Sequence, residues 1–315
     1  MIKKYIVFIL ACSMLLLAAC NSEDADGNTQ SNEDAEDTTE DATESEGDNS
    51  EEDPDQTGDE TDGANETDEK TDNTDDQSSE ETDNQTDQVG DPEAEKQYEL
   101  DTSTWSLTPI EDGTNEKVVL LTIDDVPDEN GLEMAKTLKE LDAPAIFYVN
   151  GHFIESEEDQ EALREIHDMG FAIGNHTYNH QQLSVADEET QKQEIMELDE
   201  KIEEVIGERP EFFRAPHGDN TDYAKQVVKD EGMLLMNWTY GYDYFEPYMD
   251  EDKIREAMIS GEAPEIDIDY SLLKPGAILL MHDREWTAAA LADIVEGLRE
   301  QGYEIADPNT IEIPE

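Results

Sequence analysis

Two histidines, His176 and His180, stand four residues apart directly after the short apolar run 171–173. Imidazole nitrogens bind divalent cations such as zinc at about 2 Å. If this stretch forms a helical turn, the i, i+4 spacing puts both rings on one face, where they can share one ion. Pairs with this spacing also occur among surface and core histidines that bind nothing, so the pair predicts a metal site only when other ligands accompany it.

An anionic third ligand is available at Asp124 and Asp125, which end the apolar run 120–123. Parallel strands deliver reactive side chains at their carboxyl ends, so a ligand is expected at this position. Adjacent residues of a strand point to opposite sides, which predicts that one aspartate binds the metal while the other transfers protons. Taken alone, two adjacent aspartates would instead indicate a solvated turn at the end of a strand.

Two more strand-like runs end in reactive residues, one in Arg214 and His217 and the other in His282. Two neutral imidazoles and one carboxylate leave a divalent ion with an open position, where it can polarise a carbonyl and acidify a water molecule. This predicts hydrolysis of an acyl group, with Asp124 as the base and His282 as the acid that protonates a departing amine.

In this order, the motifs resemble those of the polysaccharide deacetylases, the carbohydrate esterase family 4 that includes peptidoglycan and chitin deacetylases. The resemblance extends over about residues 115–306. The stretches that carry it are Thr122-Ile123-Asp124-Asp125-Val126, His176-Thr177-Tyr178-Asn179-His180, Arg214-Ala215-Pro216-His217, Asp243-Tyr244 and Leu280-Met281-His282. The combination is far more specific than any one of these motifs.

The resemblance implies a role for each matching residue. Asp125, His176 and His180 would be the metal ligands, Asp124 the general base and His282 the general acid. The metal would be one divalent ion, with zinc as the first candidate and cobalt, nickel or manganese as alternatives.

Further residues would support this set. By the same resemblance, Arg214 would hold the base ionised and oriented, and Asp243 would pair with the acid and favour its protonated form. The backbone N–H of His217 would join the metal in binding the oxyanion. Trp238 and Tyr244 belong to a dense aromatic stretch that could offer stacking faces for sugar rings, although about half of such aromatics are ordinarily core residues.

Three positions depart from the family pattern. Val126 stands where the family has glycine, so the turn there must avoid positive φ or accept strain. His217 replaces an aromatic residue that shapes the acetyl pocket, and Tyr244 replaces a tryptophan. None of these changes removes a metal ligand.

The function predicted on this basis is removal of N-acetyl groups from a polymeric amino sugar, with cell-wall peptidoglycan as the first candidate. One alternative is O-deacetylation of an acetylated xylan-like polymer. Another is a catalytically decayed glycan-binding lipoprotein, in which the three departures mark lost activity. The retained Asp124 and His282 argue against decay, because a binder needs neither a base nor an acid.

The first residues predict export. Lys3 and Lys4 precede an apolar stretch at 6–17 and small residues before Cys20, which is typical of a signal peptide over 1–19. The stretch is shorter than the ~20 residues of a membrane-spanning helix. By resemblance to bacterial lipoproteins, Cys20 would carry a lipid that anchors the exported protein to the membrane. Cys12 would be lost with the signal peptide, leaving no disulfide.

Residues 20–98 are predicted to be a disordered acidic linker. Over 21–100 the chain has 33 acidic residues against two basic ones and almost no apolar residues, so it cannot form a core. Repulsion between like charges would stretch this segment, which suits a tether between the membrane and a catalytic domain at 99–315. It contains no motif for a protein partner.

The predicted domain is acidic as well. Residues 101–315 hold 52 acidic and 15 basic residues, a net charge of −37. Such a surface repels nucleic acid, which is therefore excluded as a partner. Repulsion of this size destabilises a compact state at low ionic strength, so the composition indicates a saline environment.

Strands and helices are predicted to alternate from residue 117 onward. Strand-like runs at 118–121, 145–149 and 277–281 alternate with amphipathic helices at 132–141, 161–169, 188–206, 222–230, 250–259 and 286–299. Buried strands alternating with helices indicate a parallel sheet. About seven such units predict a distorted, incomplete (β/α) barrel with about seven parallel strands, the fold that the family resemblance also implies.

Overall fold

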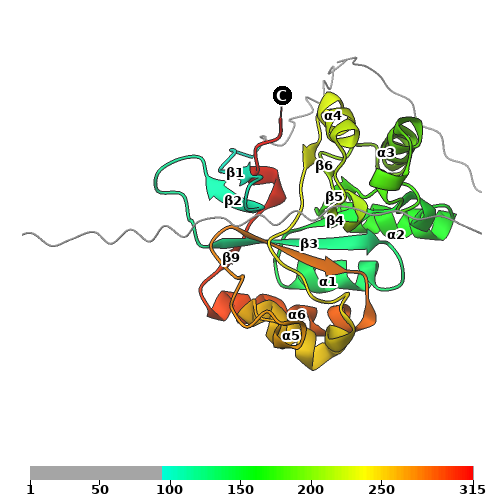
Figure 1. The fold of residues 1–315 in the computed structure, drawn as a ribbon. Helices are drawn as coiled ribbons and strands as arrows, with labels where there is room; N and C mark the ends of the chain where they lie inside the picture. The colour runs from blue at the N-terminus through cyan, green and yellow to red at the C-terminus, as the bar shows by residue number, and fades with distance from the viewer. Residues whose placement is uncertain (1–93, 315) are drawn as a thin grey trace, which may run out of the picture. The chain divides into compact units, whose positions relative to one another are not determined.

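The computed structural model of the protein describes residues 94–314 (Figure 1). The signal peptide, Cys20 and nearly all of the predicted linker lie outside these residues. Tyr98, the last residue of the predicted linker, is buried and begins strand β1. None of the helices within 94–314 is long and apolar enough to cross a membrane.

Within residues 94–314, nine strands form one sheet in the order β1-β2-β8-β3-β4-β5-β6-β7, and β9 pairs with β3. Their bounds are β1 Tyr98–Asp101, β2 Ser106–Pro109, β3 Val118–Val126, β4 Ala145–Val149, β5 Ala172–Asn175, β6 Phe212–Phe213, β7 Leu234–Leu235, β8 Ala277–His282 and β9 Glu304–Ile305. The strands β3 to β9 pair in parallel, which confirms the predicted set of seven.

The barrel is incomplete on the side between β7 and β8. After β7 the chain crosses toward β8, where Tyr240 and Leu279 form a single parallel bridge. The carbonyl of Ile278 accepts a hydrogen bond from the backbone N–H of Thr239 at 2.8 Å. The predicted open barrel is therefore correct, with irregular chain in place of a full strand at this point.

In the described part of the chain, six α-helices accompany the sheet: α1 Gly131–Glu140, α2 Glu157–Asp168, α3 Glu188–Ile206, α4 Asp222–Asp230, α5 Glu251–Ser260 and α6 Glu285–Glu300. Figure 1 shows α1, α5 and α6 grouped on one side of β3. Helix α3 has the predicted bounds and buries the predicted apolar residues Ile195, Leu198, Ile202 and Val205. It ends at Gly207, whose φ of 83° suits the left-handed turn that terminates a helix.

Helix α2 begins four residues earlier than predicted. The Ser156 hydroxyl accepts a hydrogen bond from the Asp159 N–H, and Glu157 and Glu158 occupy the first turn. Carboxylates are favourable at a helix N-terminus, because the helix dipole presents partial positive charge there. The apolar pattern begins only at Leu163, so periodicity alone placed the helix start too late.

Alternate residues of strands β3, β4 and β8 supply two of the three hydrophobic cores of the described domain. One face, with Leu121, Phe147 and Leu279, packs against helices that include α1 and α6. The other face, with Leu120 and Ile146, fills the barrel interior. The central strands β3, β4 and β8 are buried on both sides, which explains their nearly continuous apolar sequences.

A hairpin of β1 and β2 was not predicted. It joins the sheet antiparallel to β8 through Ser106 and Ala277, and its Tyr98 and Leu107 enter the interior core. The hairpin has few apolar residues of its own, and an isolated hairpin is only marginally stable. Its structure depends on docking against the barrel, which no local pattern shows.

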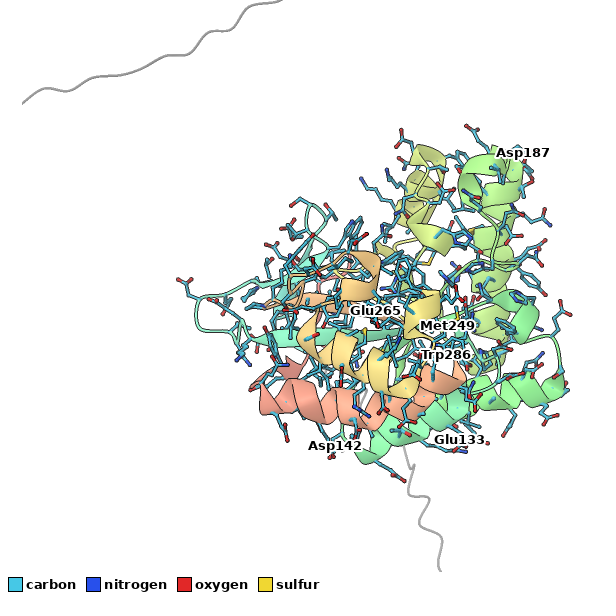
Figure 2. All side chains as sticks on the ribbon, turned by 60° about the horizontal axis from the view of Figure 1, so that its bottom comes forward. Glu133, Asp142, Asp187, Met249, Glu265 and Trp286 are labelled. Atoms are coloured by element: carbon cyan, nitrogen blue, oxygen red, sulfur yellow. The ribbon has the colours of Figure 1, made fainter. Side chains whose placement is uncertain are left out.

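The surface carries the acidic excess of the sequence. Figure 2 shows side chains such as Glu133, Asp187 and Glu265 on the outside of the domain, and all three are exposed. The charge therefore lies where dissolved salt can screen it.

Candidate active site

The histidine pair lies in an irregular loop after β5, so the predicted helical turn is wrong. Thr177 and His180 have φ values of 67° and 53°, which no α-helix contains. The two rings still meet, with centroids 5.1 Å apart between His176 and His180. The loop is held in part by the Asn150 amide, which donates to the carbonyls of His176 at 2.7 Å and Thr177 at 3.1 Å.

Helix α3 fixes the other side of this loop through Glu194. The backbone N–H of Asn179 donates to one Glu194 carboxylate oxygen at 2.7 Å, and the Asn179 side chain donates to the other at 2.8 Å. Sequence reasoning missed Glu194 and Asn150, because nothing in their spacing relates them to the histidines. Tertiary contacts thus replace the helix that was expected to align the rings.

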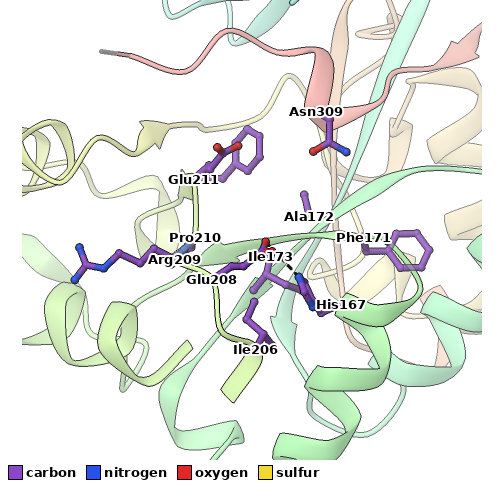
Figure 3. A pocket seen from close by; sticks show the side chains of 12 residues that line it. His167, Phe171, Ala172, Ile173, Ile206, Glu208, Arg209, Pro210, Glu211 and Asn309 are labelled. Atoms are coloured by element: carbon purple, nitrogen blue, oxygen red, sulfur yellow. Dashed lines mark ion pairs between the residues drawn. The ribbon is translucent and has the colours of Figure 1, made fainter. Parts of the chain in front are cut away.

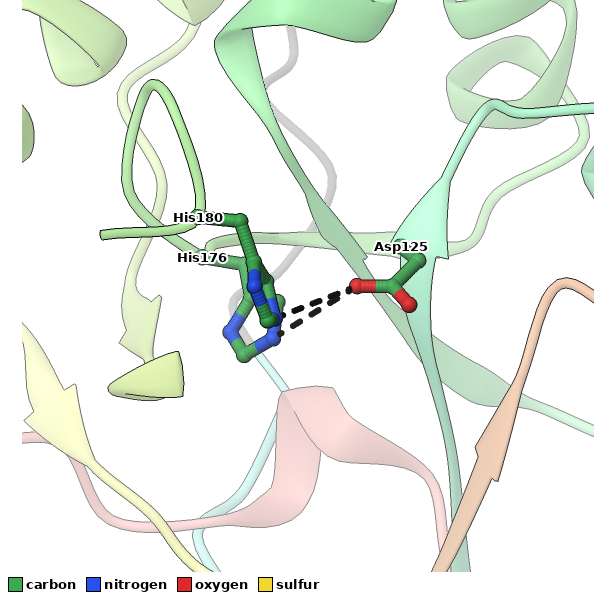
Figure 4. A group of neighbouring side chains, drawn as sticks. All are labelled: Asp125, His176 and His180. Carbon is green, nitrogen blue, oxygen red and sulfur yellow. Dashed lines mark ion pairs between the residues drawn. The ribbon is translucent and has the colours of Figure 1, made fainter. Parts of the chain in front are cut away.

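Asp125, His176 and His180 converge as predicted (Figure 4). The Asp125 Oδ1 atom lies 3.5 Å from His180 Nε2 and 3.9 Å from His176 Nε2. Tetrahedral zinc with bonds of 2.0–2.1 Å would separate its ligand atoms by roughly 3.3 Å. The three donor atoms therefore fit around one ion with only small shifts.

The protonation states of the histidines suit metal binding. His176 Nδ1 lies 2.7 Å from the Arg214 carbonyl, so this nitrogen carries the proton and leaves the Nε2 lone pair available. Burial lowers the pKa of the His176 ring. Burial, and then the neighbouring His176, lower the pKa of His180 to about 4. Both rings are neutral near pH 7, as a metal ligand must be.

Asp125 departs from the alternation expected of a strand. Its φ is 63°, and the register between β3 and β4 shifts between Ile123 and Val126. As a result Asp124 and Asp125 both line one cavity, and Asp124 Oδ2 lies 3.5 Å from His176 Nε2. The prediction that the two carboxylates point to opposite sides is wrong, because a left-handed residue interrupts the pleat.

Asp125 is also favoured as an anion. Burial by itself would raise the pKa of its carboxyl group, but the surrounding His176, His282, His180 and Arg284 lower it below the usual value. The candidate ligand set is therefore one carboxylate and two neutral imidazoles.

Val126 needs no positive φ, since the preceding aspartate adopts the left-handed conformation instead. The valine is fully buried in the core of the domain. The backbone strain that a valine would suffer at a positive φ therefore does not arise at this position.

Asp124 is paired with Arg214, as expected. Arg214 Nη1 lies 2.6 Å from Asp124 Oδ1 and also donates to the Thr122 hydroxyl at 2.8 Å. The guanidinium is fully buried, donates to the carbonyls of Met236 and Asn237, and lies 4.3 Å from the Tyr148 ring centroid. A guanidinium held at so many points also holds Asp124 in one orientation.

His282 ends β8 and is held by Asp243. Its Nδ1 lies 2.7 Å from Asp243 Oδ1, and its backbone N–H donates to Oδ2 at 2.7 Å. Thr287 donates to the same Oδ2, and the Trp286 indole donates to the Asp243 carbonyl. Burial opposes protonation of the His282 ring, but Asp243, together with Asp124 and Asp125, outweighs it and raises the pKa to about 9.

These groups surround a cavity of about 430 Å³. The lining residues are Asp124, Asp125, His176, His180, His217, Trp238, Tyr244, Leu280, His282 and Arg284. Arg214 and Asp243 do not line it and lie buried behind Asp124 and His282. The predicted residues thus form two groups, one facing the cavity and one supporting it.

The aromatic stretch divides in the same way. Trp238 and Tyr244 line the cavity, and Tyr244 stays 45% exposed with its ring 5.6 Å from that of His282. Tyr240, Tyr242 and Tyr248 are buried in the core. Two aromatic faces therefore remain for a ligand.

His217 lies in the short turn Pro216–Gly218 with φ 60° and ψ 10°. Its ring is 5.0 Å from that of His180, at an angle of 83°. The residue lines the cavity, so the substitution of histidine for the family's aromatic residue changes the wall beside the candidate metal ligands.

The family model for polysaccharide deacetylases matches residues 111–236. The described domain belongs to the polysaccharide deacetylase family. It is a hydrolase of this family with a candidate Asp-His-His metal site. Asp243 and His282 follow after the matched span; His282 lines the cavity, and Asp243 holds it from behind.

Curated relatives of this polysaccharide deacetylase cover most of the described domain. A peptidoglycan-N-acetylglucosamine deacetylase of Bacillus cereus is 28% identical over 194 residues, which is 60% of this chain and 85% of the relative. A peptidoglycan-N-acetylmuramic acid deacetylase of Bacillus subtilis is 28% identical over 199 residues, covering 60% and 69%. A chitooligosaccharide deacetylase of Sinorhizobium fredii is 25% identical over 208 residues, covering 61% and 90%.

Solved structures share the fold. A deacetylase determined with its substrate is 27% identical with a TM-score of 0.53, and the match covers 62% of this chain and 93% of that one. A family pseudoenzyme from Bacillus anthracis is 24% identical with a TM-score of 0.54, covering 63% and 67%. A mutant of that pseudoenzyme has restored activity. The fold alone therefore does not decide activity, which depends on the residues of the site.

One residue of the cavity was missed in the sequence. Arg284 follows β8 and places its Nη2 2.7 Å from Asp125 Oδ2. The only available signal was its position two residues after His282, where an arginine is equally typical of an ordinary surface residue.

A second cavity, of about 180 Å³, opens at the opposite, amino-terminal ends of β5 and β6 (Figure 3). His167 and Glu208 face each other there at 3.5 Å. None of the predicted site residues lines it. The chemistry of this deacetylase therefore belongs to the cavity at the carboxyl ends of the strands.

Proposed function

We propose that the domain removes N-acetyl groups from a polymeric amino sugar in a metal-dependent reaction, with cell-wall peptidoglycan as the substrate. The observation that carries this proposal is the single cavity in which Asp124, the three candidate ligands and His282 face one another. The similarity to peptidoglycan deacetylases of two Bacillus species supports the choice of polymer.

Asp125, His176 and His180 would hold one divalent ion, with zinc first and cobalt, nickel or manganese as the other candidates. When bound, such an ion polarises the acetyl carbonyl and lowers the pKa of water. The separations of 3.5 and 3.9 Å between the aspartate oxygen and the imidazole nitrogens support this assignment.

The proton transfers fall to Asp124 and His282. Asp124, oriented by Arg214, would accept a proton from the attacking water as its oxygen bonds to the acetyl carbon. The backbone N–H of His217 would donate to the oxyanion. His282 Nδ1 is engaged by Asp243, so its Nε2 would give a proton to the amide nitrogen as the C–N bond breaks. Acetate and a free amino sugar result.

Trp238 and Tyr244 would contact the sugar rings. Both line the cavity, and the exposed Tyr244 ring lies beside the proposed acid. Aromatic faces stack on the apolar faces of sugars and leave the ring hydroxyls free for water. The polymer would therefore cross the cavity mouth next to His282.

A decayed, glycan-binding protein is the contrasting proposal. The structural similarity to a family pseudoenzyme makes this alternative specific. Against it stand the intact pairs of Asp124 with Arg214 and of His282 with Asp243, which a binding protein has no need to keep. O-deacetylation of a xylan-like polymer requires the same residues, so only substrates distinguish it from the main proposal.

Acetate release from peptidoglycan, chitin oligomers and acetylated xylan tests these alternatives. We expect release from peptidoglycan that stops with a chelator and returns with zinc. Release from acetylated xylan alone would favour the O-deacetylase. Retention of glycan with no acetate from any of the three polymers would favour the decayed binder.

We further propose that the enzyme is exported and anchored to the membrane by a lipid on Cys20. The support is the signal-like stretch 1–19 and the acidic segment 20–98, which would hold the domain away from the bilayer. Replacing Cys20 with serine should release the protein from the membrane fraction. Unchanged membrane association of that variant would contradict the lipid anchor.

A further inference from the structure

The two oxygens of the Asp125 carboxylate face different partners. Oδ1 faces the two imidazoles, at 3.5 Å from His180 and 3.9 Å from His176. Oδ2 accepts a hydrogen bond of 2.7 Å from Arg284 Nη2. An oxygen bound to a guanidinium in this way is not free to approach an ion beside the histidines.

Arg284 is itself fixed in place. Its Nη1 donates to the Asp283 carbonyl at 2.7 Å and lies 3.6 Å from Asp128 Oδ2. The guanidinium is planar and rigid, so contacts at two of its nitrogens determine the orientation of the whole group. Its position is therefore set before any ligand reaches Asp125.

The neighbouring Asp283 ties the same two loops together. Its buried carboxylate accepts hydrogen bonds from the backbone N–H groups of Asp128, Asn130 and Gly131, at 2.6 to 2.8 Å. These residues follow Asp125 along the chain. The loop after β8 thus holds the loop after β3 in two ways. Asp283 binds backbone N–H groups of that loop, and Arg284 contacts the Asp128 side chain.

We propose that Arg284 is a positioning residue that makes Asp125 a ligand through Oδ1 alone. The inference rests on the proposed metal-dependent function and deepens it. By occupying Oδ2, Arg284 prevents both carboxylate oxygens from binding the same ion, which keeps a coordination position open.

The two aspartates are then held by one arginine each. Asp124 has Arg214 at 2.6 Å, and Asp125 has Arg284 at 2.7 Å. The first pair is fully buried, whereas the Arg284 side chain is 35% exposed at the cavity. The Arg284 side chain is therefore more accessible to replacement than the fully buried Arg214.

The test is cobalt binding by the domain from about residue 94, comparing the wild type with Arg284→Gln and Arg284→Lys. Cobalt reports its coordination number through its visible absorption. We expect Arg284→Gln to bind cobalt about 10–100-fold more weakly, because Asp125 loses the partner that orients it. We also expect this variant to absorb more weakly, because a second aspartate oxygen raises the coordination number. Arg284→Lys keeps the charge but cannot reach Asp125 and the Asp283 carbonyl together, so its affinity should also fall.

Arg255→Gln is the matched control. Arg255 pairs with Asp252 and Asp293 on the surface, and its loss changes the net charge by the same amount. This variant should bind cobalt as the wild type does. Thermal unfolding without metal checks the fold of each variant. The Arg284 side chain makes no hydrogen bond that caps α6, so its replacement removes no helix cap.

Wild-type affinity and absorption in the Arg284→Lys variant would overturn the inference, because charge alone would then suffice. Tighter cobalt binding by Arg284→Gln with an unchanged spectrum would overturn it as well. If Arg284→Gln does not fold, the lysine variant decides alone. A wild-type domain that binds no cobalt or zinc would instead contradict the metal-dependent function itself.

Discussion

Asp124 and His282 are register partners on the neighbouring parallel strands β3 and β8. Each is the site of a buried ion pair, with Arg214 behind Asp124 and Asp243 behind His282. Sheet pairing therefore sets the distance between the proposed base and the proposed acid. Asp124 and His282 can therefore act on the attacking water molecule and on the leaving amine within the same cavity.

Asp124→Asn should keep the metal and lose most of the activity. The amide cannot accept the proton of the attacking water, and a positioned base typically contributes about 10²–10⁴-fold to the rate. The measurements are metal content and kcat for acetate release. Activity within a few-fold of the wild type would assign the base to another residue.

His176→Ala and His180→Ala should each abolish stoichiometric metal binding. Each removes one of three ligands, and two ligands do not hold a divalent ion firmly. His152→Ala is the control, because this exposed histidine lies outside the cavity. The measurement is the metal content of each purified variant. One full equivalent of metal in both ligand variants would rule out this triad.

Asp243→Asn should move the titration of His282 to lower pH. The folded-state pKa of His282, about 9, lies above the ordinary value of about 6.5 because of Asp243 and the two active-site aspartates. The stability from this pair is complete below about pH 6.5 and is lost as the pH rises through about 9.

The measurement is an NMR titration of the His282 ring in the metal-free domain, together with the pH dependence of acetate release. We expect the wild-type rate to fall as the pH passes about 9, where the acid loses its proton. The alkaline limb of Asp243→Asn should lie at least one pH unit lower, in line with the loss of a charged partner. Coincident titrations would show that Asp243 does not control the acid.

The domain should become more stable as salt is added. With a net charge of −37 over residues 101–315, repulsion between surface carboxylates falls as the screening length shrinks from about 30 Å at 0.01 M to about 3 Å at 1 M. A series of melting curves in NaCl, at saturating metal, measures this effect. A flat or falling midpoint would mean that the carboxylates are paired or well solvated, and would remove the support for a saline environment.

Much of the site was predictable because its chemistry depends on residue type and order. Asp124, Asp125 and His282 lie at the carboxyl ends of strands, and His176 and His180 follow a strand. Parallel strands bring their carboxyl ends to one edge. Helix α3 was predictable for a similar reason, since its apolar spacing and Gly207 are local signals.

The local geometry of the ligands was not predictable. Asp125 and His180 adopt left-handed φ values, which are uncommon outside glycine even though Asp and His adopt them more often than most residues. Contacts from distant parts of the chain stabilise these conformations, among them the Asn150 amide, Glu194 of α3 and Asp283 after β8.

By itself, the sequence determined the family, the alternation of strands and helices and the identity of the reactive groups, because these follow from short-range patterns. Only the tertiary structure decided that both aspartates face one cavity, that the histidines meet without a helix, and that Arg284 binds Asp125 Oδ2. Those relationships join residues up to 159 positions apart in the chain. Such contacts form only when the whole sheet assembles, so no local propensity contains them.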